Sequence, residues 1–164
     1  MQSGRILVAQ HEGTFVIKLV GDVRLTLCTT IDEFFVRMFA TPGFVGVVID
    51  LSEAEGIDST SLGLLAKLAN QSKEFYQLVP MIISPNPNIT RLLNSMGFDR
   101  VFAIHASNTV TIHTAHSLGE LPVVCADEQC VRAKIIEAHR VLMDMNEKNR
   151  NEFSDLVATL EAVT

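Results

Sequence analysis

Long apolar runs are missing from this 164-residue chain, and none approaches the roughly 20 residues that a membrane-spanning helix needs. The first residues, MQSGRILVAQHEG, also lack the apolar stretch and small-residue cleavage site of a secretory signal. We therefore expect a cytoplasmic protein that does not enter a membrane.

A surplus of positive charge is equally absent, because Asp and Glu outnumber Lys and Arg by 19 to 13 and the net charge is −6. Proteins that bind nucleic-acid backbones show a basic stripe, so direct nucleic-acid binding is not expected. Cys28, Cys125 and Cys130 have no CxxC spacing and are expected to be reduced thiols. What the chain does have is apolar material: 48% of its residues are hydrophobic, which is ample for a folded core.

Signatures of catalysis and metal binding are missing too. There is no Walker lysine loop and no GxGxxG, and GIDSTSLG is not the GxSxG nucleophile elbow. His113 and His116 have HxxH spacing, but no carboxylate or third ligand accompanies them. A serine hydrolase would need a positioned histidine and acid, and the sequence nominates neither. We therefore expect no enzyme activity, no cofactor and no metal.

Strand and helix patterns alternate along the first two-thirds of the chain. RILVA and FVIKLVGDV, the second ending at Gly21, predict a hairpin that turns at Glu12-Gly13. The apolar runs VGVVIDL, VPMIIS and VFAIH predict strands buried within a sheet. Between them we expect a helix capped by Thr29 or Thr30, a helix at the centre of the chain, and a short helix capped by Asn88. This order predicts an α/β fold with a mostly parallel sheet.

The chain changes character after Pro122. Residues 127–163 contain no Gly and no Pro, and their apolar residues fall near one face of a long helix. The polar stretch 146–151 is where we expect this helix to break or to leave the domain. We therefore predict an α/β domain over 1–121 and a helical extension over 122–164, with the stripe packed on the domain. The alternatives are a homodimer contact or a seat for a second regulator. Truncation after Gly119 is predicted to leave a folded domain, and 107–125 is open between strand, loop and helix.

The stretch EGIDSTSLGLLAKLA holds four oxygen-bearing side chains in a row, Asp58 to Ser61, at the start of the central helix. One of them is enough to cap a helix, and the simple alternative is that the others are solvated. The stretch follows a buried parallel strand, however, so it lies at the carboxyl edge of the sheet, where α/β proteins place their sites. Gly63 removes a side chain one turn later and permits a close approach. A serine at a helix start is also a good phosphoacceptor, because the positive end of the helix dipole accommodates the added charge.

VVIDLSEAEGIDSTSLGLLAKLA resembles the signature of the STAS domain (sulfate transporter and anti-sigma factor antagonist), and KLVGDV and IISPNPNITRLLNSMGFDRVFAIH resemble two further segments of that family. The likeness covers about Gly4 to His105. In small members the serine after the motif aspartate is phosphorylated, which corresponds to Ser59. Ser61 replaces the family's glycine and is a rival acceptor, and Arg24 replaces an acidic residue, which bears on partner recognition.

The resemblance implies an anti-sigma factor antagonist that works by partner switching. Its unphosphorylated form sequesters an anti-sigma factor, which is also a serine kinase of the histidine-kinase-like ATPase type, and a sigma factor is freed. A PP2C-type phosphatase reverses the modification. The alternative is a STAS scaffold subunit of a signalling or lipid-transport complex that does not switch. The predicted partner contacts are Gly21, Asp22, Asp58, Ser59, Thr60, Ser61, Ser84, Pro85 and Asn86.

Overall fold

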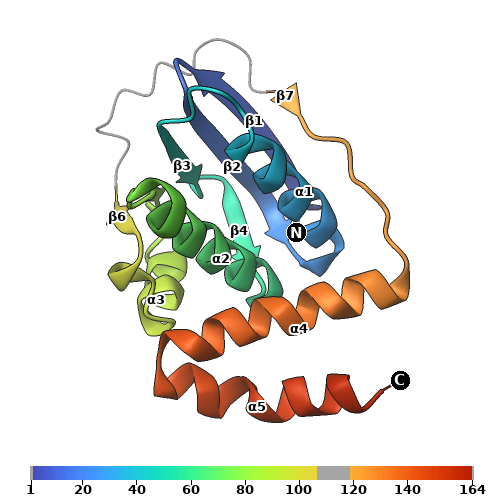
Figure 1. The fold of residues 1–164 in the computed structure, drawn as a ribbon. Helices are drawn as coiled ribbons and strands as arrows, with labels where there is room; N and C mark the ends of the chain where they lie inside the picture. The colour runs from blue at the N-terminus through green and yellow to red at the C-terminus, as the bar shows by residue number, and fades with distance from the viewer. Residues whose placement is uncertain (1, 107–118, 164) are drawn as a thin grey trace.

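The computed structural model describes residues 2–106 and 119–163, and among these residues a seven-stranded sheet forms the centre of the protein (Figure 1). The order is β6-β5-β3-β2-β1-β7, and β4 pairs with the far end of β2. Pairs β2–β3, β2–β4, β3–β5 and β5–β6 are parallel, whereas β1 pairs antiparallel with β2 and β7. The strands are β1 (Arg5–His11), β2 (Thr14–Val23), β3 (Gly46–Asp50), β4 (Ala54–Ile57), β5 (Met81–Ile83), β6 (Ala103–His105) and β7 (Gly119–Glu120). The predicted mostly parallel α/β fold is confirmed.

The β1–β2 turn forms where the sequence predicts it. Glu12 and Gly13 both have positive φ, 50° and 86°, as a tight hairpin turn requires. Strand β2 continues past the predicted end at Gly21, because a register shift after this residue lets Asp22 and Val23 pair with β4. Strand β4 itself is not predicted by the sequence.

The helices of the domain lie against the sheet (Figure 1). Inward-facing side chains of β2 and β3, such as Ile17, Leu19 and Ile49, share one core with α1 and α2, while Val16 and Val48 belong to a smaller cluster on the opposite face. The helices are α1 (Cys28–Phe39), α2 (Ser59–Tyr76) and α3 (Pro87–Ser95), with short 3₁₀ turns at Leu25–Leu27 and Phe98–Arg100.

Two predicted caps are wrong. Helix α1 begins at Cys28, directly after the first 3₁₀ turn, so Thr29 and Thr30 lie inside the helix and are buried. The Thr30 hydroxyl instead accepts a hydrogen bond from the Val124 amide at 2.8 Å, which holds the segment after β7 against α1. At α3 the cap is Asn86, whose side chain accepts from the Asn88 amide at 2.9 Å.

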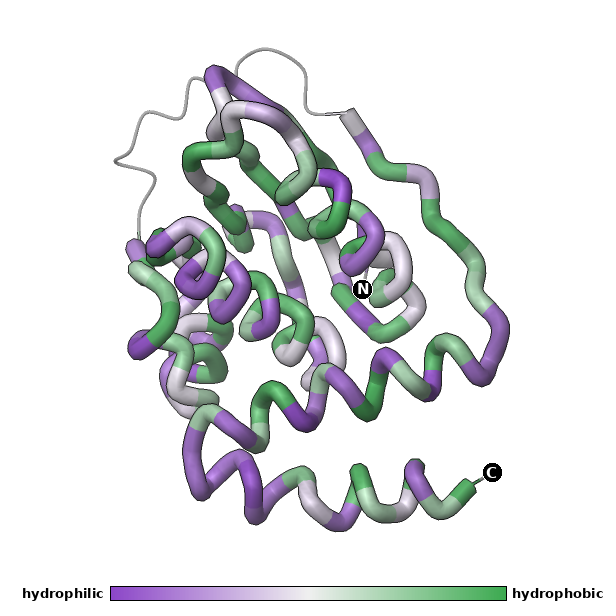
Figure 2. The backbone as a smooth tube through the Cα atoms, in the orientation of Figure 1, coloured by the Kyte–Doolittle hydropathy of each residue, from purple (hydrophilic) through white to green (hydrophobic). Residues whose placement is uncertain are grey.

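The C-terminal extension is a helical hairpin of α4 (Glu128–Met145) and α5 (Glu147–Ala162). The predicted break occurs at Asn146, which ends α4 and caps α5 through a 2.8 Å hydrogen bond from the Asn149 amide. Green and purple alternate along both helices in Figure 2, as expected for helices with one buried face. Ala138, Leu142 and Phe153 belong to the same core cluster as the α/β domain. The stripe therefore packs on the domain.

None of the helices in the described part of the chain combines the length and apolarity that a bilayer crossing requires. The predicted strand-like stretch 110–113, together with His113 and His116, lies outside the described residues. Within the described residues, no three His, Cys, Asp or Glu side chains gather closely enough to hold a metal ion.

Candidate functional site at the start of α2

Asp58 fixes the beginning of α2. One carboxylate oxygen accepts from the Ser61 amide at 2.9 Å, which caps the helix, and the other accepts from the Leu25 amide at 2.7 Å. The Asp58 amide also donates to the Val23 carbonyl at 3.0 Å. Asp58 therefore joins α2 to the end of β2 and to the first 3₁₀ turn, and it places a held negative charge beside Ser59.

Ser59 is the first residue of α2 and is half-buried. Its hydroxyl lies 2.8 Å from Nε2 of His139, a residue of α4 that is 80 positions away in the chain. The His139 ring is buried, and its Nδ1 lies 2.7 Å from the Ile135 carbonyl on the preceding turn. Because a carbonyl can only accept, Nδ1 carries a hydrogen, and in the neutral ring Nε2 accepts the hydrogen bond that Ser59 donates.

A serine next to a histidine resembles half of a hydrolase triad, but the surroundings differ from such a site. The group that orients His139 is the Ile135 carbonyl rather than a carboxylate, so it does not supply the charge that stabilises an imidazolium during catalysis. The ring of Phe153 packs edge-on against the imidazole at 5.0 Å, and His139 has only 1% of its surface exposed. The pair therefore has the features of a packing contact between two helices.

Thr60 and Ser61 do not share the half-exposed position of Ser59. Thr60 is 3% exposed and Ser61 is fully buried, with no hydrogen-bond partner for its hydroxyl among the described residues. The four oxygen-bearing side chains from Asp58 to Ser61 therefore do not form one surface. The turn of α2 directs successive residues to different sides of the helix. The Ser61 hydroxyl is therefore not accessible from the surface in this arrangement, whereas Ser59 is half-exposed.

Gly21 and Asp22 pair with Ala54 and Gly56 of β4, the strand that leads into α2. Gly21 has φ +77° and is buried. Asp22 pairs with Arg24, whose guanidinium is exposed and also lies within the field of Asp58. Arg24 is thus the exposed cation at this corner, beside two carboxylates.

The third predicted contact segment is engaged with α3. The Ser84 hydroxyl is buried and lies 2.8 Å from the Thr90 hydroxyl, and the Asn86 side chain caps the helix. Pro85 is exposed. Gly21 and Asp22 thus lie on the strand pair β2–β4 that leads to Asp58, whereas Ser84 and Asn86 serve the start of α3.

An ion-pair cluster, here named the Asp32 cluster, joins α1, α2 and α4 beside this site. Asp32 accepts from Lys67 at 3.0 Å and from Lys134 at 2.6 Å, and Lys67 also pairs with Glu137. Burial raises the pKa of Asp32, but the hydrogen bonds from Lys134 and Lys67 outweigh it and hold the pKa below its ordinary value. The cluster therefore stabilises the docking of α4 while Asp32 is ionised.

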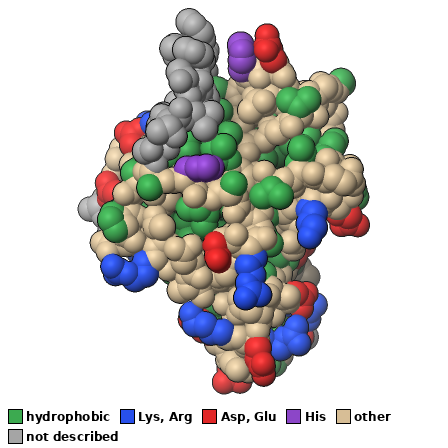
Figure 3. Space-filling view, turned by 90° about the vertical axis from the view of Figure 1, so that its left-hand side faces the viewer, with side chains coloured by type: hydrophobic (Ala, Val, Ile, Leu, Met, Phe, Trp, Pro, Cys, Tyr) green, Lys and Arg blue, Asp and Glu red, His purple; other side chains and the backbone are tan. Residues whose placement is uncertain are grey.

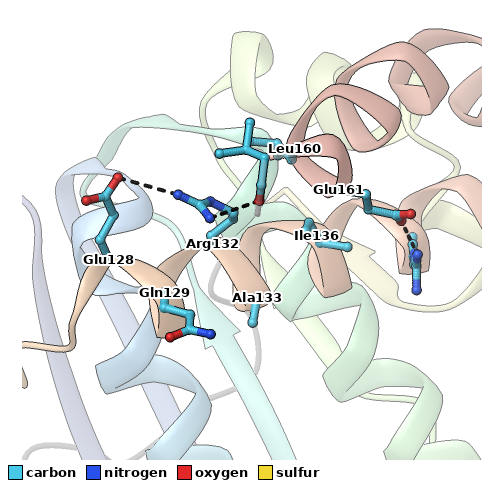
Figure 4. Close-up of a pocket in the computed structure, with 9 residues that line it drawn as sticks. Glu128, Gln129, Arg132, Ala133, Ile136, Leu160 and Glu161 are labelled. Carbon is cyan, nitrogen blue, oxygen red and sulfur yellow. Dashed lines mark hydrogen bonds and ion pairs between the residues drawn. The ribbon is translucent and has the colours of Figure 1, made fainter.

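A hollow on the hairpin lies away from Ser59. Figure 4 shows its lining by α4 and the end of α5, with Arg132 between Glu128 and the chain end. Arg132 donates to the Val163 carbonyl at 3.2 Å and lies 3.6 Å from Glu128. The residues of α4 that face this hollow, Arg132 and Ile136, are not those that face α2.

Sequence reasoning missed His139. Two signals for it were present: it follows Ile135 by four residues, so it lies beside the apolar stripe, and a histidine there needs a polar partner. The sequence did not show which element the apolar stripe of α4 would pack against. The sequence predicts a close approach at Gly63, but only the fold shows that the neighbour is Ala138.

The comparisons with known proteins agree with this architecture. The STAS domain family model matches residues 5–115, which is more than half of the chain. Among solved structures, the anti-sigma factor antagonist SpoIIAA in its unphosphorylated form is similar, with a TM-score of 0.53 and 15% sequence identity over 68% of this chain and 96% of that one. No curated protein matches the sequence. The sequence motif, the fold and the family match agree, and the chain belongs to the STAS domain family.

Proposed function

We propose that the protein is an anti-sigma factor antagonist, a phosphorylation-controlled protein-binding switch without catalysis of its own. The observation that carries this proposal is the position of Ser59, as the first residue of α2 directly after the capping Asp58, at the carboxyl edge of a STAS sheet. The similarity to a solved anti-sigma factor antagonist supports the same function.

The electrostatics of this corner suit a switch. A phosphate on Ser59 would add roughly 1.5 to 2 negative charges beside Asp58, whose carboxylate is already fixed by two amide donors. The start of α2 accommodates an anion through its dipole, so the helix survives. A partner that docks closely on the unmodified corner would meet a concentrated negative charge after modification, and its binding would weaken.

The partners follow from the family. The proposed cycle takes place in the cytoplasm. In it, the unphosphorylated protein sequesters an anti-sigma factor that is also a serine kinase of the histidine-kinase-like ATPase type. A PP2C-type phosphatase restores the binding form. The contact surface is proposed to include Asp58, Ser59, Asp22 and Arg24, and Pro85 remains a predicted contact at the neighbouring strand end. Figure 3 shows basic and acidic side chains interspersed on the face beside β6 and α3, without the stripe of positive charge that a nucleic-acid backbone would require.

The test is a capture experiment from the native cell with three full-length variants. Ser59→Ala is expected to retain the anti-sigma partner, and Ser59→Asp to lose it. Ser52→Asp is the matched control, because Ser52 is an exposed serine between β3 and β4 and its substitution adds the same charge away from α2. Equal capture by Ser59→Ala and Ser59→Asp would contradict the switch and favour a scaffold.

A further inference from the structure

The α4–α5 hairpin packs across the first half of α2, as Figure 1 shows, and so shares the surroundings of Ser59. We propose that this hairpin is an internal cover for the phosphoacceptor, so that docking of α4 and a phosphate on Ser59 exclude each other. The inference deepens the proposed function and rests on it for one statement only, that Ser59 is the residue that receives the phosphate.

Helix α4 approaches α2 more closely than side chains normally permit. A Cβ atom added at Gly63 would lie 2.3 Å from the Ala138 carbonyl oxygen and 2.7 Å from the Ala138 Cβ. Glycine on one helix and alanine on the other therefore allow the two backbones to meet, and Ala138 is fully buried there. Gly63 lies four residues after Ser59, on the same side of α2. The contact thus fixes α4 directly beside the phosphoacceptor.

The space next to the Ser59 hydroxyl is filled by the cover. Only 2.8 Å separates Oγ from Nε2 of His139, and a phosphoryl group would put a phosphorus and three oxygens there. The imidazole cannot swing aside alone, because the Ile135 carbonyl holds Nδ1 and the Phe153 ring packs against it. A phosphate on Ser59 therefore requires α4 itself to move.

The charges at the contact would not compensate a phosphate. Asp58, adjacent to Ser59, is negative, and the nearby Arg24 is already paired with Asp22. The lysines at the helix contact, Lys67 of α2 and Lys134 of α4, are engaged in the Asp32 cluster. A phosphate on Ser59 would thus lie beside cations that already have carboxylate partners. Burial of a charge without a partner is costly. Repulsion and steric overlap act in the same direction.

In the proposed release, the hairpin leaves the domain as a unit. Arg140 of α4 pairs with Glu161 of α5, so the two helices hold each other. The far end is attached through the Met96 carbonyl, which accepts from the amide nitrogens of Asn149 at 2.9 Å and of Asn146 at 3.2 Å. The Asn149 amide oxygen is buried without a partner among the described residues, which offsets part of what these bonds contribute.

The test introduces the phosphate at position 59 during protein synthesis, so no kinase is needed. Phosphoserine is incorporated at position 59 of the full chain by genetic code expansion, and hydrogen exchange is followed by mass spectrometry. We expect the protection of α4 and α5 amides to fall at least tenfold relative to the unmodified protein, while β2, β3 and α2 keep theirs. Ser59→Ala removes one hydrogen bond without adding bulk or charge, so its effect on α4 should be smaller. Phosphoserine at Ser52, which does not touch α4, is the control and should leave exchange unchanged.

Two results would overturn the inference. If α4 kept its protection with phosphoserine at position 59, docking and modification would be compatible. If all elements lost protection together, the hairpin would be an inseparable part of the fold rather than a cover. Both outcomes are independent of the capture experiment, because purified protein is measured without any partner. Loss of α4 protection with no anti-sigma partner captured would therefore contradict the anti-sigma partner of the proposed function, while the mutual exclusion of α4 docking and a Ser59 phosphate would stand.

Discussion

Replacement of Gly63 by alanine is expected to weaken the docking of α4 on α2 in a single substitution. The new methyl group would lie 2.3 Å from the Ala138 carbonyl oxygen and 2.6 Å from its carbonyl carbon, so α4 must shift. Overpacking of this kind typically costs about 1–3 kcal/mol. Alanine is also a better helix former than glycine by about 1 kcal/mol, a gain that α2 keeps whether or not α4 is docked. The docking equilibrium alone should therefore shift, by about 5- to 150-fold.

The assay is hydrogen exchange of full-length Gly63→Ala, peptide by peptide. Amides of α4 should exchange faster by that factor, while those of β2 and β3 should exchange at the wild-type rate or more slowly. Gly46→Ala is the matched control, because a Cβ at Gly46 meets nothing within 4 Å. Wild-type protection of α4 in Gly63→Ala would show that the close helix approach does not determine docking, and the reasoning would be refuted.

Three further outcomes are expected. Asp58→Ala should lower the free energy of unfolding by about 1–2 kcal/mol, measured by urea denaturation, because α2 loses its cap; an unchanged midpoint would contradict this. Asp32 has a lowered pKa because Lys134 and Lys67 outweigh burial, so its contribution is present at neutral pH and is lost as the pH falls below about 4; α4 exchange should rise over that range and stay flat in Asp32→Asn. Cys28 is 1% exposed and burial raises the pKa of its thiol, so Ellman's reagent should modify it far more slowly than the two exposed cysteines; three equal rates would contradict the buried position.

The sheet could be predicted because its signals are local. Continuous apolar runs such as VVI and MII predict buried strands wherever they occur, and their alternation with helices implies parallel pairing. Strand β4, with the sequence AEGI, has no such signal. It is a strand because β2 is long enough to offer unpaired groups beyond β3, which is a property of two distant segments. The predicted cap at Thr29 or Thr30 was wrong because a 3₁₀ turn brings the start of α1 forward to Cys28, which leaves Thr30 inside the helix, bonded to the Val124 amide.

At the candidate site, the helix start behind a buried strand could be predicted from the sequence, but which oxygen caps it could not. The structure gives that role to Asp58, directly before Ser59. The burial of Ser61 did not follow, because the sequence does not fix the rotation of α2 relative to the sheet. His139 could not be assigned to Ser59 either, because that contact depends on where an appendage 80 residues away settles.

The segment between β7 and α4 gives the hairpin a permanent tether. It is short, pairs with β1 at one end and is hydrogen-bonded to α1 on the way. A released α4 would stay close to α2 at an effective concentration that a free peptide reaches only at about millimolar levels. Any protein that binds the same surface must therefore compete with the tethered α4. The apparent affinity of that protein is reduced in proportion to the fraction of molecules in which α4 is undocked. The tether thus sets a concentration threshold for the partner, which the composition of the binding surface alone does not determine.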